Sequence, residues 1–124
     1  MTNETLIELF VERMNALDWD GVYAMMRDDI VYHNMPFPPL EGLDAVKGFF
    51  SGVGEIRDCD WRIENIACQG DVVQTERLDN FSLDGKAVSL PVMGVFELRE
   101  GKISKWRDYF DLKTFEDQLG RPLA

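Results

Sequence analysis

Three short segments each place two polar or aromatic side chains two residues apart, and together they hold the groups that an acid/base reaction needs. They are Tyr32-His33-Asn34, Arg77-Leu78-Asp79 and Trp106-Arg107-Asp108. In a β-strand, residues i and i+2 point to the same face. If the alternate members face one pocket, they bring together two carboxylates, a guanidinium, a phenol, an amide and an indole. The pattern therefore indicates an acid/base site built on strands.

The charges of these residues predict how such a site would divide its protons. Two carboxylates close together, Asp79 and Asp108, resist double ionisation when buried, and Arg77 between them offsets that cost. With one proton shared by the two aspartates, the triad is electrically neutral. One aspartate can then act as base and the other as acid, each typically contributing about 10² to 10⁴ in rate. Tyr32 and Asn34 supply donors and an acceptor that can hold a water against the base.

The alternation of side chains favours an inward position for one of the two carboxylates. Trp106, Asp108 and Phe110 share a face that is more apolar than the opposite face of the same segment. Asp108 is therefore expected to point inward. Arg77 and Asp79 also share a face, but hydrophobicity alone does not assign it, and a surface network of ion pairs stays open as an alternative for the charged residues.

The other polar candidates have plain structural interpretations when they are taken one at a time. Tyr32 and Asn34 alone would indicate packing at the end of a strand and a turn. His33 is the only histidine, and its parity puts it opposite Tyr32 and Asn34, so a structural or surface role is expected. Cys59 and Cys68 lack metal-ligand spacing and are expected to be reduced thiols packed as small hydrophobes.

The elements that must position these residues follow from the apolar spacing. Helical spacing is found at 3–17, with Asn3 as the expected N-cap, near 22–29, at 42–53 and near 114–119. Strand patterns and turn signals indicate strands at 30–35, about 58–64, 72–83, 86–99 and 102–111. Helices placed before a meander of strands favour an α+β fold in which a curved, antiparallel sheet wraps the helices, with core and pocket on its concave face.

Length and composition restrict the partners of this chain. Its 124 residues predict a single domain over residues 1–124. A formal net charge of −10 is unfavourable for binding nucleic acid or an anionic membrane, so a small neutral or apolar molecule is the expected partner. No apolar run is long enough to cross a membrane, and Met1-Thr2-Asn3-Glu4 does not resemble a signal peptide, so a cytoplasmic location is expected.

The same three segments resemble a known family. Val31-Tyr32-His33-Asn34-Met35-Pro36, Glu76-Arg77-Leu78-Asp79 and Trp106-Arg107-Asp108-Tyr109-Phe110-Asp111 are similar to the motifs of the limonene-1,2-epoxide hydrolase family, in order and spacing. The resemblance covers nearly the whole chain. It implies the cone-shaped α+β fold of the nuclear transport factor 2 (cystatin-like) and SnoaL-like superfamily, with a curved, mixed, mostly antiparallel sheet wrapped around N-terminal helices.

The resemblance also implies a role for each candidate residue. Asp108 matches the base, which deprotonates a water that Tyr32 and Asn34 also hold. Asp79 matches the acid that protonates the epoxide oxygen, and Arg77 matches the arginine that orients both carboxylates. The family opens the ring in one push-pull step to give a vicinal diol, without a covalent intermediate, a metal or a cofactor. A small apolar epoxide and water are the implied substrates.

The pocket and the assembly are less closely defined by the sequence. Trp106 matches the aromatic residue beside the base, and Leu40, Phe50 and Phe96 are further candidates for an apolar pocket wall. A strip of outward-facing apolar side chains around Met93 indicates a contact that a homodimer could use.

Two other functions stay open. The same fold hosts ketosteroid isomerases and polyketide cyclases, which use an aspartate as base on a carbon acid. A non-catalytic module that binds a small molecule is the other alternative, since a fold does not determine a function. The pair of aspartates argues against that module, because a binder of apolar ligands has no evident need for two carboxylates.

Overall fold

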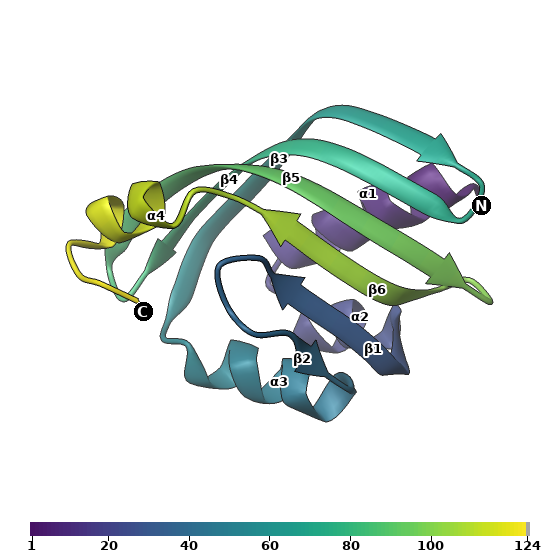
Figure 1. Ribbon diagram of the computed structural model, residues 1–124, viewed down its shortest axis with the longest axis horizontal. Helices are drawn as coiled ribbons and strands as arrows, with labels where there is room; N and C mark the ends of the chain where they lie inside the picture. Colours follow the sequence, from purple (N-terminus) through teal and green to yellow (C-terminus); the bar gives the residue numbers. More distant parts are fainter. Residues whose placement is uncertain (124) are drawn as a thin grey trace.

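A curved six-stranded sheet in the order β2-β1-β6-β5-β4-β3 is the framework of the computed structural model, which describes residues 1–123 (Figure 1). The strands are β1 (Met26–Asn34), β2 (Leu40–Glu41), β3 (Ile56–Gln69), β4 (Val72–Leu83), β5 (Lys86–Arg99) and β6 (Lys102–Tyr109). Strands β1 and β6 are parallel, and all other neighbours are antiparallel. The prediction of a mixed, mostly antiparallel sheet is confirmed. The predicted single domain extends to residue 124, which lies outside the described residues.

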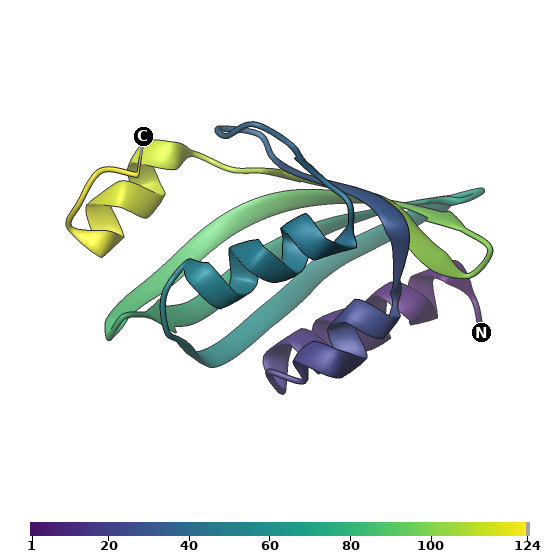
Figure 2. The ribbon, with the colours of Figure 1, turned by 90° about the horizontal axis from the view of Figure 1, so that it is seen from below.

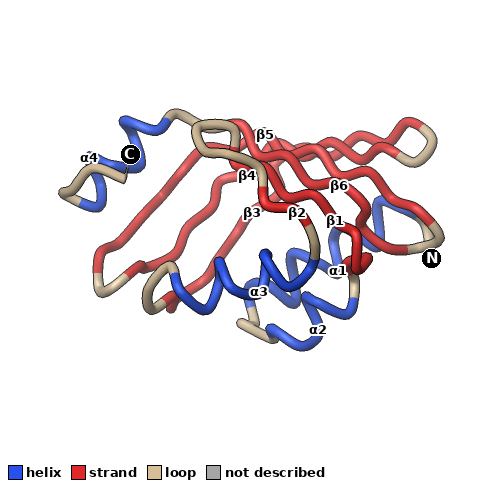
Figure 3. Tube along the Cα trace, turned by 60° about the horizontal axis from the view of Figure 1, so that its bottom comes forward, coloured by secondary structure: helices blue, strands red, loops and turns tan. Residues whose placement is uncertain are grey.

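Helices cover the concave face of this sheet. They are α1 (Asn3–Asn15), α2 (Trp19–Ala24), α3 (Leu43–Gly52) and α4 (Leu112–Leu119). Figures 2 and 3 show α1, α2 and α3 side by side within the curve of the sheet, whereas α4 lies near one end and contacts β5. The predicted α+β class, with N-terminal helices wrapped by the sheet, is therefore confirmed. None of the helices within residues 1–123 is long and apolar enough to cross a membrane.

The first helix shows how the sequence pattern produces the core. Ile7, Phe10 and Met14 recur at spacings of three and four residues, and all are buried against the sheet. The N-cap is Thr2, not Asn3 as expected, because the Thr2 side chain accepts a hydrogen bond from the Thr5 backbone N–H at 3.1 Å. The core therefore lies on the concave side of the sheet. A polar side chain that points to this side is buried and needs a hydrogen-bond partner.

Element boundaries differ from the predictions where the sheet is irregular. The second helix ends at Ala24, so residues near 26–29, expected to be helical, begin β1, whose pairing with β6 shifts register before Val31. Strand β3 is longer than the expected 58–64, because two register shifts interrupt its alternation without ending its pairing with β4. The short edge strand β2, which was not expected, pairs Leu40 with Tyr32.

Candidate active site

Four neighbouring strands place the polar candidates in transverse rows across the concave face. One row runs through Thr75 of β4, Gly94 of β5, Asp108 of β6 and Asn34 of β1. In the adjacent row, Trp106 lies opposite Tyr32. Residues directly opposite one another in a sheet point to the same side, so the second and third segments of the sequence pattern meet on one surface. The first segment joins them through the parallel pairing of β1 with β6.

A buried arginine joins the two carboxylates. Arg77 Nε and Nη2 donate to Asp79 Oδ1 and Oδ2 at 3.0 and 2.9 Å, and Nη2 also donates to Asp108 Oδ2 at 3.0 Å. The Arg77 side chain is 0% exposed and each aspartate side chain 5% exposed. The alternative of a surface ion-pair network is therefore wrong. The expectation that Asp108 points inward is confirmed, and Arg77 and Asp79 point inward as well.

Trp106 supports two of the polar groups at once. Its Nε1–H donates to Asp108 Oδ1 at 2.8 Å, and its ring stacks on Tyr32 with centroids 3.9 Å apart. The Tyr32 hydroxyl in turn donates to Asn34 Oδ1 at 3.2 Å. Both oxygens of Asp108 thus accept a hydrogen bond from the protein, and the Tyr32–Asn34 pair is held beside it. Such preorganisation favours one orientation of the carboxylate and of any water placed between these groups.

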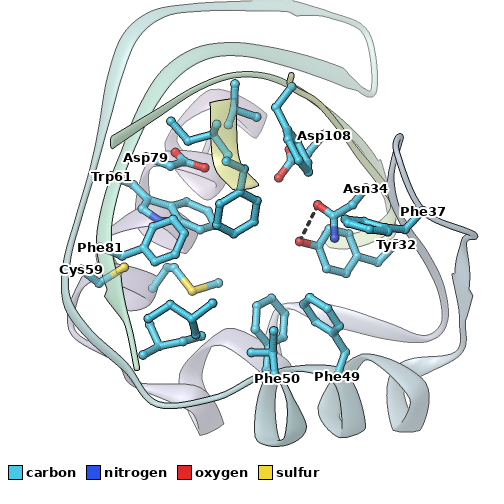
Figure 4. Close-up of a pocket in the computed structure, with 18 of the residues that line it drawn as sticks. Tyr32, Asn34, Phe37, Phe49, Phe50, Cys59, Trp61, Asp79, Phe81 and Asp108 are labelled. Carbon is cyan, nitrogen blue, oxygen red and sulfur yellow. Dashed lines mark hydrogen bonds between the residues drawn. The ribbon is translucent and has the colours of Figure 1, made fainter. Parts of the chain in front are cut away.

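These groups open onto an apolar cavity of about 330 Å³. Figure 4 shows Asp79 and Asp108 on one side of it, the Tyr32–Asn34 pair beside Asp108, and aromatic rings of α3 across from the carboxylates. The remaining lining residues are almost all aliphatic or aromatic, namely Met14, Phe37, Phe49, Phe50, Val53, Ile56, Cys59, Trp61, Phe81, Leu83, Leu90, Val92, Phe110, Phe115 and Leu123. The cavity can therefore enclose an apolar molecule and expose one part of it to two carboxyl groups.

Only one of the four residues predicted to line the apolar pocket does so. Phe50 lines the cavity, but Trp106, Phe96 and Leu40 do not, which corrects the expectation for these three. Trp106 and Phe96 are 0% exposed and stack on each other behind the polar row, with ring centroids 5.6 Å apart. Leu40 lies on the edge strand β2, beyond Tyr32.

Several lining residues were not predicted. Phe81 and Phe110 continue the i+2 series of Asp79 and Asp108, and that alternation could have identified them. Residues from α4 and the tail behind it carried no local signal, because only the tertiary fold brings them to the cavity. Cys59 lines the cavity and is half-buried, whereas Cys68 is exposed, contrary to the expectation that both thiols are packed.

His33 has a structural role, as expected from its position on the face opposite Tyr32 and Asn34. Its Nε2–H donates to the Phe37 backbone carbonyl at 2.8 Å and braces the turn after β1. The cavity lining does not include it. Among residues 1–123, no three or more His, Cys, Asp or Glu side chains gather in a way that could hold a metal ion.

Burial controls the protonation of the groups around the cavity. Burial, opposed by Arg77 and assisted by Asp108, raises the pKa of Asp79 from 3.8 to about 6. Burial raises the pKa of Tyr32 well above its ordinary value, and burial raises that of Cys59 to about 12. Burial disfavours the charge of Arg77, but the two carboxylates outweigh it and raise its pKa. Asp79 therefore keeps a proton up to about pH 6, with the Tyr32 phenol and the Cys59 thiol neutral.

This pKa shift predicts how stability depends on pH. Because folding raises the pKa of Asp79 from 3.8 to about 6, its stabilising contribution is complete below pH 4 and is lost as the pH rises past 6. The loss is of the order of 2 to 3 kcal/mol of unfolding free energy. In Asp79→Asn this loss is absent, so the variant should gain stability relative to the wild type between pH 4 and pH 8.

Urea unfolding at several pH values measures this difference. Asp60→Asn, on an exposed strand position, is the matched control and should follow the wild type at each pH. A difference between Asp79→Asn and the wild type that stays constant from pH 4 to 8 would contradict the raised pKa.

Comparisons with known proteins identify the family to which this chain is similar. The family model described as "Limonene-1,2-epoxide hydrolase catalytic domain" matches residues 1–121. The curated relative "Epoxide hydrolase EphG" of Mycobacterium tuberculosis (strain ATCC 25618 / H37Rv) is 33% identical over 118 residues, which cover 95% of this chain and 79% of that protein.

Two solved structures share the fold. The structure of an M. tuberculosis LEH-like epoxide hydrolase superposes with a TM-score of 0.81 at 32% identity, covering 98% of this chain and 91% of the other. A SnoaL-like structure from Shewanella putrefaciens CN-32 has a TM-score of 0.84 at 17% identity, with coverage of 97% and 98%. This second likeness concerns the fold alone, and it confirms the expected SnoaL-like architecture.

Proposed function

Because this chain belongs to the limonene-1,2-epoxide hydrolase family, we propose that it adds water to an apolar epoxide and releases a vicinal diol. The observation that carries the proposal is the pair of buried carboxylates, Asp79 and Asp108, joined by Arg77 at the wall of an apolar cavity. An epoxide needs both a base to activate water and an acid to protonate its oxygen. The two aspartates are suited to these two tasks because only one of them holds a proton.

In the proposed step, a water hydrogen-bonded by Tyr32 and Asn34 loses a proton to Asp108 as its oxygen attacks an epoxide carbon. The carbon–oxygen bond of the ring breaks at the same time, and Asp79 gives its proton to the departing oxygen. One proton has then entered the pair and one has left, so the charge of the triad with Arg77 is unchanged. Transfer of the proton from Asp108 back to Asp79, directly or through water, restores the starting state.

The wall of the cavity supports a neutral, apolar substrate. Among residues 1–123, its lining includes the carboxyl groups of Asp79 and Asp108 but no lysine, arginine or histidine. An anionic substrate would therefore face two acidic groups with no exposed cation to pair with, which is unfavourable in a site of low dielectric. An apolar body, by contrast, gains from leaving water for a wall of aliphatic and aromatic side chains.

Hydrolysis in ¹⁸O-labelled water tests the function and the mechanism together. The substrates are terpene, cycloalkene, aryl and sterol epoxides, with chiral analysis of the diols. We expect one labelled oxygen per diol, taken from water, even in the first turnover. Oxygen transferred from the protein in a single turnover would indicate a covalent ester and contradict the one-step mechanism. Proton exchange from a ketosteroid without turnover of any epoxide would favour an isomerase instead.

A further inference from the structure

Thr75 is a buried polar residue that the proposed reaction does not use. It is 0% exposed and lies behind the cavity wall, two residues before Arg77 on β4. Its hydroxyl donates to the Gly94 backbone carbonyl at 3.3 Å and accepts a hydrogen bond from Arg77 Nη1 at 3.0 Å. Since a hydroxyl has one proton, its donation to Gly94 leaves a lone pair directed at the guanidinium. The Thr75 hydroxyl therefore acts only as a hydrogen-bond acceptor toward Arg77.

Gly94 provides the space in which this contact forms. A Cβ atom at Gly94 would lie 2.1 Å from Arg77 Nη1, 2.8 Å from Asp108 Oδ1 and 3.0 Å from Thr75 Oγ1. Gly94 is not among the glycines with positive φ, so its backbone conformation is open to other residues. Glycine is needed here because the guanidinium occupies the volume that a side chain would fill.

Two aromatic rings also contact the guanidinium. Its central carbon lies 4.8 Å from the centroid of the Trp61 ring and 5.8 Å from that of Phe96. Aromatic rings at these distances attract the cation, but the attraction does not single out one of its nitrogens. Thr75 adds a directional contact because its hydroxyl accepts from Nη1 alone.

The pairing of Arg77 with the two aspartates is unequal. Asp79 receives two hydrogen bonds, from Nε and Nη2, whereas Asp108 receives one, from Nη2. Both Arg77 Nη1 and Asp108 Oδ1 lie next to the position that a Cβ atom of residue 94 would take. If Nη1 were released from Thr75, the guanidinium could turn so that Nη1 donates to Asp108. That turn would weaken the two hydrogen bonds between Arg77 and Asp79.

We propose that Thr75 is a positioning residue that holds Arg77 in its two-point pairing with Asp79 and its single bond to Asp108, with Gly94 keeping the necessary space open. This inference rests on the proposed function. The unequal pairing of Arg77 with the two aspartates suits their roles as acid and base. Two hydrogen bonds stabilise the carboxylate that Asp79 becomes after it donates its proton. Asp108 receives one hydrogen bond from Arg77 and one from Trp106 Nε1, which hold it beside the Tyr32–Asn34 pair.

The test compares Thr75→Val, which keeps the shape but removes the hydroxyl, with Thr75→Ser, which keeps the hydroxyl. We expect Thr75→Val to lower kcat about tenfold with little change in KM, because Thr75 acts behind the wall and not on the substrate. Thr75→Ser should restore most of kcat. A loss confined to KM in Thr75→Val would overturn the proposal.

Titration of the Asp79 carboxyl by ¹³C NMR gives a readout that does not depend on turnover, with Asp79→Asn identifying the signal. In Thr75→Val we expect its midpoint to move upward from about 6, because Asp79 loses part of its contact with Arg77. The other titratable groups facing Asp79 are Asp108, Tyr32 and Cys59, and the last two stay neutral across this pH range. A variant that is only less stable, with an unchanged midpoint, would show a merely structural hydroxyl and overturn the proposal.

Gly94→Ala extends the test, with Gly48→Ala as its control, because a Cβ at Gly48 meets nothing within 4 Å. We expect Gly94→Ala to lower kcat at least tenfold and to move the Asp79 midpoint, and Gly48→Ala to do neither. If the wild type hydrolyses no epoxide, the proposed function fails while the carboxyl titration still tests Thr75. If the wild type hydrolyses epoxides and Thr75→Val matches it in kcat and midpoint, the positioning role is wrong.

Discussion

Replacement of Asp108 by asparagine should lower kcat/KM for epoxide hydrolysis by at least about 10³-fold, within the range typical for loss of a general base. The variant loses the group that accepts the proton of water. It also affects the acid, because the negative charge of Asp108 helps to raise the pKa of Asp79. Without that charge the pKa of Asp79 falls, although its burial still raises it, so Asp79 holds less of the proton that the epoxide oxygen needs. One substitution thus weakens both proton transfers.

The fold should tolerate Asp108→Asn. The amide oxygen can still accept from Trp106 Nε1, and Arg77 keeps Asp79 as its ion-pair partner. Initial rates of diol formation measure the effect, with circular dichroism and thermal unfolding as controls for folding. Asp60→Asn, an exposed carboxylate on β3, should keep the rate of the wild type. A rate for Asp108→Asn within tenfold of the wild type would contradict its role as base.

Replacement of Arg77 by methionine should cost about 3 to 5 kcal/mol of unfolding free energy and abolish measurable hydrolysis. The side chain of Arg77 is fully buried and supplies the positive charge between two buried carboxylates. Methionine fills much of the volume but leaves Asp79 and Asp108 with no counter-charge. Both carboxyl groups are then driven toward the protonated form, so the deficit in stability should grow as the pH rises from 5 to 8.

A triple variant separates charge from packing. Arg77→Met combined with Asp79→Asn and Asp108→Asn removes all three charges and should recover most of the stability lost in Arg77→Met, since burying neutral groups avoids an uncompensated charge. It should remain inactive. Urea unfolding at pH 5 and pH 8 measures the series. An Arg77→Met protein within 1 kcal/mol of the wild type at pH 8 would show that the arginine does not compensate the carboxylates.

The polar site was predictable because it follows the period of a regular strand. Alternation along β6 predicted that Asp108 points inward, and alternation along β4 put Arg77 and Asp79 on one shared face without deciding which face it was. The antiparallel hairpins then bring those faces together without a change of register between β4 and β5. Where local alternation determines which side chain faces inward, the residue types in the pattern are enough to propose the chemistry.

The surroundings of the site were less predictable, for a different physical reason. Phe96 belongs to a correctly predicted strand, whereas Leu40 lies on the edge strand β2, which was not expected. The depth of Phe96 behind Trp106 and the edge position of Leu40 depend on packing between elements. Gly94 has no side chain whose type could signal the space it provides. Thr75 has the ordinary character of a strand residue, and only its partner Arg77 gives its hydroxyl a purpose.

We expect the parallel pairing of β1 with β6 to form late in folding. The meander from β3 to β6 forms from neighbouring hairpins, so the ion triad can assemble from contacts close in sequence. Asn34 reaches Asp108 only when distant parts of the chain are joined, and closing such a long loop is entropically costly and slow. A chain that had folded only its meander would therefore have its charges paired but no place for the attacking water, and we expect it to be inert toward an electrophile until β1 docks.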